Sequence, residues 1–196
     1  MLRKLLWGLN ALLYIPFVKS IRFPTYIGPA TFTKGLRNVV IGKKVRIFPR
    51  IRIETYGQGG IIIGDDVSIG QNFHIISGEI SPPLTIGAHT TISGNVLITN
   101  IDHEYRELDK HIMEQQFLIR HTSIGENCFI GYGAAIQAGT ILGQQCIVGA
   151  NSVVRGTFPD YCVIVGAPAR IVKRYNFELG LWEPAAPDGS FLSVKK

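Results

Sequence analysis

The segment IGENCFIGYGAAIQAGTILGQQCIVGANSVVRGTF, residues 124–158, carries an aliphatic residue at every sixth position. Six matches neither the 3.6-residue period of a helix nor the simple alternation of a half-buried strand. A short fixed period is typical of a hexapeptide solenoid, in which one repeat cannot bury its apolar face alone. The segment therefore predicts a parallel β-helix of short strands joined by turns. The periodic positions are Ile124, Ile130, Ile136, Leu142, Val148 and Val154.

The same period returns upstream in three shorter runs. They are Ile41, Ile47 and Ile53; Ile63, Ile69 and Ile75; and Ile86, Ile92 and Ile98. If three hexapeptides make one triangular turn, each run is one coil, and residues 124–154 supply two more. The steps between runs are 10, 11 and 26 residues instead of six, so all three insertions follow the third side of a coil. Insertions in repeat proteins collect on one face, often the binding face. We therefore expect the chemistry at this corner.

Composition bounds the remaining choices. A chain of 196 residues suits one domain, and a net charge of +6 favours an anionic partner. No basic stripe with interleaved aromatic residues is present, which argues against nucleic acid. The three cysteines lack metal-binding spacing. Cys128 and Cys146 are one full coil apart, so we expect them to stack inside the prism as small core residues in a reducing compartment.

Residues 1–22 predict an amphipathic helix, because leucines keep helical spacing until Pro16 ends the run. The stretch is too short to span a bilayer, and no signal-peptide cleavage site follows it. Two interpretations remain open: a cap on the open end of the solenoid, or an interfacial helix resting on the inner membrane from the cytoplasmic side. In the second, the cations near lipid head groups would be Arg3, Lys4, Lys19 and Arg22. We expect the β-helix over 23–174 and an extended tail over 175–196.

Residues 99–122, TNIDHEYRELDKHIMEQQFLIRHT, lack the six-residue period and hold three of the five histidines. We interpret them as an arm that leaves the prism at the corner with the insertions, because a long insertion in a compact domain is usually functional or mobile. His103 lies near its start, and histidine is suited to proton abstraction near neutral pH. His111 and His121 are expected on the surface.

These residues resemble those of the hexapeptide-repeat acyltransferases, which are left-handed β-helix enzymes. The likeness is strongest to the O-acetyltransferases of lipopolysaccharide O-antigen biosynthesis, which are related to maltose and galactoside acetyltransferases. It covers about 63–174 and rests on Ile86-Gly87, Gly94-Asn95-Val96, His103, Ile124-Gly125-Glu126-Asn127-Cys128-Phe129-Ile130-Gly131, Val148-Gly149-Ala150-Asn151-Ser152-Val153-Val154 and Val165-Gly166-Ala167-Pro168-Ala169-Arg170. The left hand is implied by the resemblance alone, since crossovers are otherwise right-handed.

The resemblance implies a homotrimer with acetyl-CoA in a cleft between two subunits. His103 would act as general base on a sugar hydroxyl, which attacks the thioester directly. No metal is expected. The positions implied to bind the cofactor are Gly131, Tyr132 and Ala150 at the pantetheine arm, and Arg155, Arg170 and Lys173 near the nucleotide.

The acceptor positions depart from those of the galactoside enzymes. Their acceptor-binding asparagine falls on Gly70 here, with Asn72 two residues on, and their aspartate falls within 76–79, where only Glu79 is acidic. We therefore do not expect a simple galactoside or maltose as acceptor. Asn95 either approaches the site or forms a plain turn with Gly94. Phe129 stands where these sugar acetyltransferases usually carry a tryptophan.

Several alternatives stay open. The carboxylate that orients His103 is one of Asp102, Glu104 and Asp109. The acceptor is alternatively an amino sugar or another small molecule. A zinc hydratase of the γ-class carbonic anhydrase type would need three converging histidines, yet His74 and His89 occupy different places in their hexapeptides. The last alternative is a non-catalytic β-helix scaffold.

Overall fold

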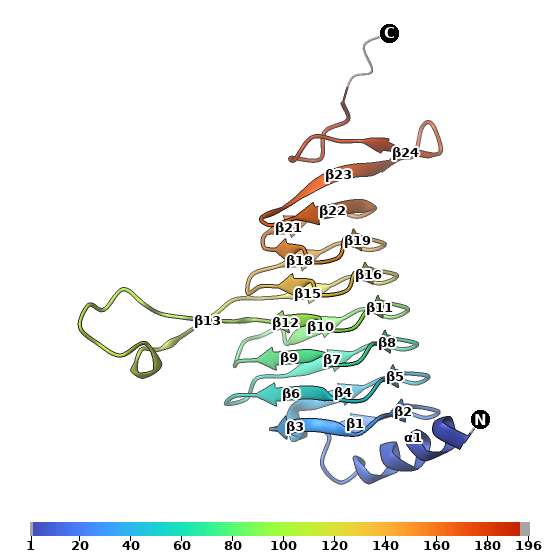
Figure 1. The fold of residues 1–196 in the computed structure, drawn as a ribbon, viewed down its shortest axis with the longest axis vertical. Helices are drawn as coiled ribbons and strands as arrows, with labels where there is room; N and C mark the ends of the chain where they lie inside the picture. The colour runs from blue at the N-terminus through green and yellow to red at the C-terminus, as the bar shows by residue number, and fades with distance from the viewer. Residues whose placement is uncertain (1, 193–196) are drawn as a thin grey trace.

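A computed structural model describes residues 2–192 of the chain. The chain winds into a triangular prism whose three faces are parallel sheets, here called A, B and C (Figure 1). Each coil contributes one strand to each sheet in turn. The predicted left-handed parallel β-helix is thereby confirmed, and it begins one coil before Ile41, with β1 to β3.

The strands are short, as hexapeptide sides require. Sheet A contains β1 (Ser20–Ile21), β4 (Val39–Ile41), β7 (Ile61–Ile63), β10 (Leu84–Ile86), β15 (Ser123–Ile124), β18 (Ile141–Leu142) and β21 (Thr157–Phe158). Sheet B contains β2 (Tyr26–Ile27), β5 (Arg46–Ile47), β8 (Ser68–Ile69), β11 (Thr91–Ile92), β16 (Phe129–Ile130), β19 (Ile147–Val148), β22 (Cys162–Gly166), β23 (Ala169–Asn176) and β24 (Leu181–Pro184). Sheet C contains β3 (Ala30–Lys34), β6 (Ile51–Thr55), β9 (His74–Ser77), β12 (Leu97–Thr99), β17 (Ala135–Ile136) and β20 (Val153–Val154).

The periodic aliphatic residues form buried columns inside the prism. Ile63 pairs with Ile86, which pairs with Ile124, as the period predicts. Burial of such side chains contributes about 1.5–3 kcal/mol each. Cys128 and Cys146 stack with Cys162 in a further buried column, and all three are free thiols. The hydrogen bond with Cys128 and, to a lesser degree, burial raise the pKa of Cys146 to about 12.

The three corners of the prism differ. Those between sheets A and B, and between B and C, are tight turns with a residue of positive φ, such as Asn127 (φ 55°) and Asn95 (φ 58°). The corner between sheet C and the next strand of sheet A takes the insertions after β6, β9 and β12. We call it the CA corner. The prediction that all three insertions share one corner is confirmed.

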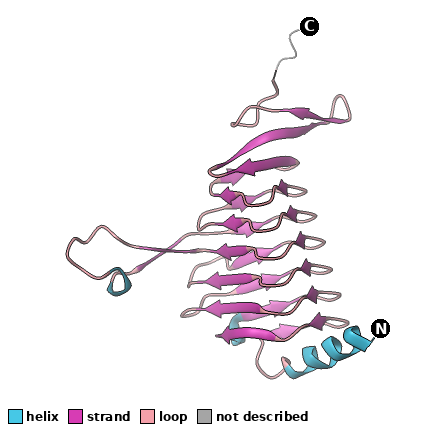
Figure 2. Ribbon diagram, in the orientation of Figure 1, coloured by secondary structure: helices cyan, strands magenta, loops and turns pink. Residues whose placement is uncertain are grey.

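The insertion after β12 is the predicted arm, which projects from the prism (Figures 1 and 2). Its root is a two-stranded antiparallel ribbon of β13 (Ile101–His103) and β14 (Phe117–Ile119), and its far part contains the 3-10 helix η2 (Ile112–Glu114). The root lies close against the insertion after β9: a Cβ on Gly78 would meet Ile119 at 2.6 Å. Buried Asn100 accepts the backbone N–H of Gly78 at 2.7 Å, which fixes this junction.

Each end of the prism is covered. Helix α1 (Leu2–Leu13) packs on the end of the prism through buried Ala11 and through Trp7, whose ring meets Phe48 of the second coil edge-on at 5.2 Å. A 3-10 helix, η1 (Leu36–Asn38), joins the first two coils. At the other end, β23 and β24 add antiparallel strands to sheet B, so the expected tail continues the sheet.

No helix within residues 2–192 is long and apolar enough to cross a membrane. The side chains of Arg3 and Lys4, named for the interfacial interpretation, lie outside the described residues.

Candidate functional site

His103 is the last residue of β13, so it lies where the arm leaves the CA corner. Its register partner Phe117, on β14, packs against the imidazole edge-on with ring centroids 5.1 Å apart. Phe117 also meets Tyr56 edge-on at 5.5 Å. The imidazole is exposed to solvent and borders two pockets. The ribbon thus presents an exposed imidazole between two cavities.

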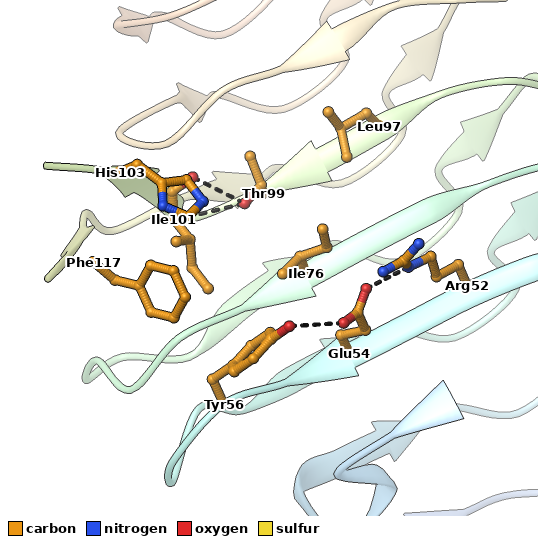
Figure 3. A pocket seen from close by; sticks show the side chains of 9 residues that line it. All are labelled: Arg52, Glu54, Tyr56, Ile76, Leu97, Thr99, Ile101, His103 and Phe117. Carbon is orange, nitrogen blue, oxygen red and sulfur yellow. Dashed lines mark hydrogen bonds and ion pairs between the residues drawn. The ribbon is translucent and has the colours of Figure 1, made fainter. Parts of the chain in front are cut away.

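The first cavity, here called the β6 pocket, has a volume of 280 Å³. Its base is apolar, with Ile76, Leu97 and Ile101, while Arg52, Glu54 and Tyr56 come from β6 and the turn that follows it (Figure 3). Thr99, His103 and Phe117 complete the lining. Figure 3 shows His103 and Glu54 bordering the same space. An apolar base with a few convergent polar groups is typical of a small-molecule site.

Glu54 is the most deeply buried charged group of the β6 pocket, with 2% of its surface exposed. Its carboxylate accepts hydrogen bonds from Arg52 Nε and from the Tyr56 hydroxyl, the latter at 2.9 Å. Burial by itself raises the pKa of Glu54, but the hydrogen bonds from Arg52 and Tyr56 outweigh it and hold the pKa below its ordinary value. Glu54 is therefore an ionised acceptor of hydrogen bonds at neutral pH.

The second cavity, here called the arginine pocket, has a volume of 490 Å³. Its lining comprises Asp102, His103, Tyr105, Arg106, Leu118, Arg120 and Arg155. Arg155 comes from the turn after β20, and its guanidinium donates to Asp102 Oδ2 at 2.9 Å. Arg120 lies 3.8 Å from the same carboxylate. A guanidinium group has five N–H donors, so two such groups beside one carboxylate retain donors that can bind an anionic ligand.

Two of the three carboxylates proposed to orient His103 are engaged elsewhere. Asp102 pairs with Arg155, and Glu104 accepts the backbone N–H of Tyr105 and the side chain of Arg106, both at 2.9 Å. These hydrogen bonds, beginning with that of Tyr105, lower the pKa of Glu104. Asp109 occupies an exposed turn of the arm with φ 58°. Within residues 2–192 none of the three makes a hydrogen bond to His103, so the question of the orienting group stays open.

The residues proposed for the acceptor lie apart from His103 in a single copy of the chain. Asn72 and Asn95 are turn residues at the corner between sheets B and C, where Asn72 Nδ2 donates to Asn95 Oδ1 at 2.8 Å. Phe129 lies on the outer surface of sheet B. Glu79 is at the CA corner, but its carboxylate accepts the backbone N–H of Gln58 at 3.1 Å, and it is not part of the lining of the β6 pocket.

The residues proposed for the cofactor fall into three places. Gly131, Tyr132 and Ala150 lie together at the corner between sheets B and C, where a Cβ on Gly131 would meet Ala150 N at 2.6 Å. Arg155 lies at the CA corner in the arginine pocket. Arg170 and Lys173 are exposed on β23 at the C-terminal end. One copy of the chain does not gather them into a single site.

The remaining histidines are spread over the molecule. His74 is exposed on sheet C, and His89 is a turn residue between sheets A and B, 3.4 Å from Asp66. His111 accepts the backbone N–H of Met113 on the arm. Among residues 2–192 no three His, Cys, Asp or Glu side chains gather as metal ligands would.

Sequence reasoning missed Arg52, Glu54, Tyr56 and Phe117. Arg52 and Glu54 lie on β6 and Tyr56 is the first residue after it, so all three stand where the insertion after β6 begins, at the same corner as the arm. That position was a usable signal, because the corner was already expected to carry the chemistry. The placement of Phe117 depends on the ribbon pairing of β13 with β14, which no six-residue pattern encodes.

A family model described as the hexapeptide repeat of succinyl-transferase matches residues 121–155. Among curated proteins, WbbJ of Escherichia coli, provisionally named a lipopolysaccharide biosynthesis O-acetyl transferase, is 34% identical over 174 residues, which cover 85% of this chain and 84% of WbbJ. WcaF of Escherichia coli, provisionally named a colanic acid biosynthesis acetyltransferase, is 32% identical over 145 residues, which cover 72% of each chain.

The fold is also found among solved structures. AntD of Bacillus cereus, an N-acyltransferase in complex with dTDP and 3-hydroxybutyryl-CoA, superimposes with a TM-score of 0.71. The match covers 87% of this chain and 90% of AntD at 19% identity, so the likeness concerns the fold alone.

Proposed function

Because this chain belongs to the hexapeptide-repeat acyltransferases, we propose that it is an acetyl-CoA-dependent O-acetyltransferase that modifies a sugar hydroxyl during the biosynthesis of a bacterial surface polysaccharide. The observation that carries the proposal is the place of His103, exposed at the root of the arm and bordering a pocket large enough for one sugar ring. The relatives WbbJ and WcaF, named for lipopolysaccharide and colanic acid, support a polysaccharide precursor as acceptor.

In this proposal His103 is the general base. It removes the proton from the acceptor hydroxyl, and the oxygen forms a bond to the acetyl carbonyl carbon while the bond from that carbon to sulfur breaks. The proton then passes from the imidazolium to the departing thiolate, which leaves as free CoA. A hydroxyl is a weak nucleophile at neutral pH, and a positioned base supplies about 10²–10⁴-fold.

We assign the acceptor to the β6 pocket. Sugars present hydroxyl groups around an apolar ring, and this pocket offers the ionised Glu54 and the Arg52 guanidinium beside the side chains of Ile76 and Leu97. Glu54 would accept hydrogen bonds from hydroxyl groups that do not react. The aromatic side chains of Tyr56 and Phe117 give the pocket a rigid wall, because their rings hold each other edge-on.

Acetyl-CoA would then approach His103 from the side of the arginine pocket, in a cleft shared by two copies of a homotrimer. The separation of the expected cofactor residues supports sharing. Tyr132 and Ala150 lie at the corner between sheets B and C, whereas Arg155 lies at the CA corner. Three prisms packed side by side around a threefold axis would place these two corners of neighbouring copies on one cleft.

The test is release of thiol from acetyl-CoA with a panel of sugar acceptors. The His103→Ala variant is compared with His111→Ala, which removes another histidine from the same arm. We expect acceptor-dependent release to fall by about 10²–10⁴-fold in the first variant and to stay unchanged in the second.

Each outcome decides something. Equal release by wild type and His103→Ala would remove His103 from the mechanism. Release only with amino-sugar acceptors would transfer the proposal to N-acetylation. Failure of the protein to bind acetyl-CoA would contradict the transferase itself and leave a binding module or scaffold.

A further inference from the structure

Helix α1 has two apolar faces, and capping the prism uses only one of them. The inner face packs on the first two coils through Ala11, Trp7 and the hydrogen bond from Asn10 Nδ2 to Ile27 O at 2.8 Å. The outer face consists of leucines that are each between 47% and 68% exposed: Leu5, Leu6, Leu9, Leu12 and Leu13. At about 100° per residue these leucines span an arc of about 120° on the side opposite the packed residues.

The exposed apolar surface continues past the helix. Ile15 and Phe17, which are 50% and 58% exposed, follow the helix directly, and Phe23, which is 41% exposed, comes after β1. Contiguous apolar patches of this kind are uncommon on monomeric soluble proteins and mark sites of interaction with a protein or a membrane. We call the outer leucines together with these three residues the leucine face.

Charge distinguishes this end of the molecule from the rest. Residues 1–53, a stretch that ends within β6 one residue before Glu54, contain 11 of the 20 Lys and Arg residues and none of the 14 Asp and Glu residues. Asp65 and Asp66 on the next coil pair with Arg22, Lys43 and Arg46. Within residues 5–53, five exposed cations make no ion pair in the described part of the chain: Lys19, Lys34, Arg37, Lys44 and Arg50.

We propose that the α1 end of the prism docks on an anionic lipid surface. The leucine face would enter the boundary between head groups and acyl chains, and the surrounding cations would meet lipid phosphates. A helix with one apolar face, flanked by Lys and Arg, binds interfaces in this way, and each cation near an anionic surface adds to the affinity. In Figure 1, α1 lies across the end of the prism opposite the C-terminus, so docking would leave the arm free of the lipid.

The charge decides between lipid and the other occupant that fits an apolar face, a second copy of this chain. Two copies joined through their leucine faces would bring together two ends that each hold 11 cations and no acidic residue within residues 1–53. Like charges at such a contact repel, whereas an anionic surface neutralises them. The proposal goes beyond the acetyltransferase function and does not depend on it.

The experiment is flotation of the full-length protein with vesicles of phosphatidylcholine alone and of phosphatidylcholine mixed with phosphatidylglycerol. The test variant is Leu9→Glu with Leu12→Glu on the leucine face. The matched control is Leu108→Glu with Leu179→Glu, two leucines that are 87% and 60% exposed far from α1. Thermal unfolding followed by circular dichroism verifies that each variant is folded.

We expect the wild type and the control to float with the anionic vesicles, and the partition coefficient of the test variant to fall at least tenfold. Raising the salt concentration should weaken binding, because screening acts on exposed charges. The proposal is overturned if the wild type does not float with anionic vesicles, or if the folded test variant floats equally well. It is also overturned if the protein does not bind vesicles and sedimentation velocity shows that the leucine face joins two copies of the chain.

Discussion

The corner between sheets A and B and the CA corner are built from the same chain at the same levels of the prism, yet they behave differently. At the first, successive coils turn through a residue of positive φ, from Lys44 to Tyr161, with φ between 50° and 60°. At the CA corner, the chain leaves the coil after β6, β9 and β12, and each time it re-enters the prism as the next strand of sheet A. One corner is repetitive, and the other carries every long insertion.

The difference shows how a solenoid separates folding from chemistry. Stability comes from the aliphatic columns, in which each side chain packs only against the preceding and following coils. A corner whose residues are not part of these columns can therefore vary without loss of stability. Both pockets at His103 are formed from such free segments and from outward-facing residues of sheet C. Changes in the coils should therefore act on stability, and changes at the CA corner on activity.

The largest expected effect on stability is in a column. Ile86 is fully buried between Ile63 and Ile124, so Ile86→Ala removes packing on both sides and leaves a cavity. We expect the free energy of unfolding to fall by about 2–5 kcal/mol. Urea unfolding followed by circular dichroism, at one protein concentration for all variants, measures this.

The matched control is Leu108→Ala on the arm, because Leu108 is 87% exposed. We expect its free energy of unfolding to stay within about 0.5 kcal/mol of wild type. Equal destabilisation by both substitutions would show that the arm is part of the folding core, and the contrast between coil and corner would then be wrong.

The next effect concerns activity at the CA corner. Glu54→Gln keeps the shape of the side chain but removes the charge that Arg52 and Tyr56 hold in the β6 pocket. A hydrogen bond to a charged group contributes about 1.5–3 kcal/mol, so we expect kcat/KM for the acceptor to fall by about 10- to 100-fold. Steady-state kinetics at saturating acetyl-CoA measure it.

Glu79→Gln is the comparison variant, which distinguishes an acceptor site in the β6 pocket from one at Glu79. The resemblance places Glu79 at the acceptor, while the structure has its exposed carboxylate against the backbone of Gln58. We expect Glu79→Gln to leave kcat/KM nearly unchanged. The reverse pattern, with Glu79→Gln impaired and Glu54→Gln active, would place the acceptor outside the β6 pocket.

The fold could be predicted from the sequence because every coil repeats the same six-residue pattern of buried aliphatic residues. A strand with an aliphatic residue at each sixth position pairs with copies of itself, so the period fixes the register of Ile63, Ile86 and Ile124 without knowledge of the rest. The position of the arm followed from the spacing alone, and His103 followed from its place in the arm.

The pockets could not be predicted in the same way, because they depend on contacts that have no period. Arg155 meets Asp102 across 53 positions of sequence, and Phe117 reaches His103 only because the arm returns as a ribbon. Asn72 and Asn95 were candidates for the acceptor, with a plain turn as the alternative for Asn95, and in one copy of the chain both occupy turns at another corner.

The smallest expected effect is on the pH dependence of stability, and it compares a buried carboxylate beside the coils with one on the arm. The hydrogen bonds from Arg52 and Tyr56 hold the pKa of Glu54 below its ordinary value of 4.5, although burial opposes them. The folded state therefore binds fewer protons at Glu54 than the unfolded state does near pH 4. The ionised Glu54 thus contributes stability fully above about pH 4.5 and loses it as the pH falls through the folded pKa.

Urea unfolding of wild type and Glu54→Gln between about pH 7 and pH 3 tests this, because Gln cannot titrate. We expect the wild type to be the more stable at neutral pH and the difference to shrink below about pH 4.5. Glu107→Gln, whose exposed carboxylate pairs with Lys110 on the arm at 2.9 Å, should show almost no difference at any pH, since solvent screens such pairs. If the Glu54→Gln difference persisted unchanged to pH 3, the ion pair with Arg52 would not stabilise the fold. The packing of the coils would then hold the Glu54 side chain in place whether or not it is ionised, and its charge would matter only for binding of the acceptor.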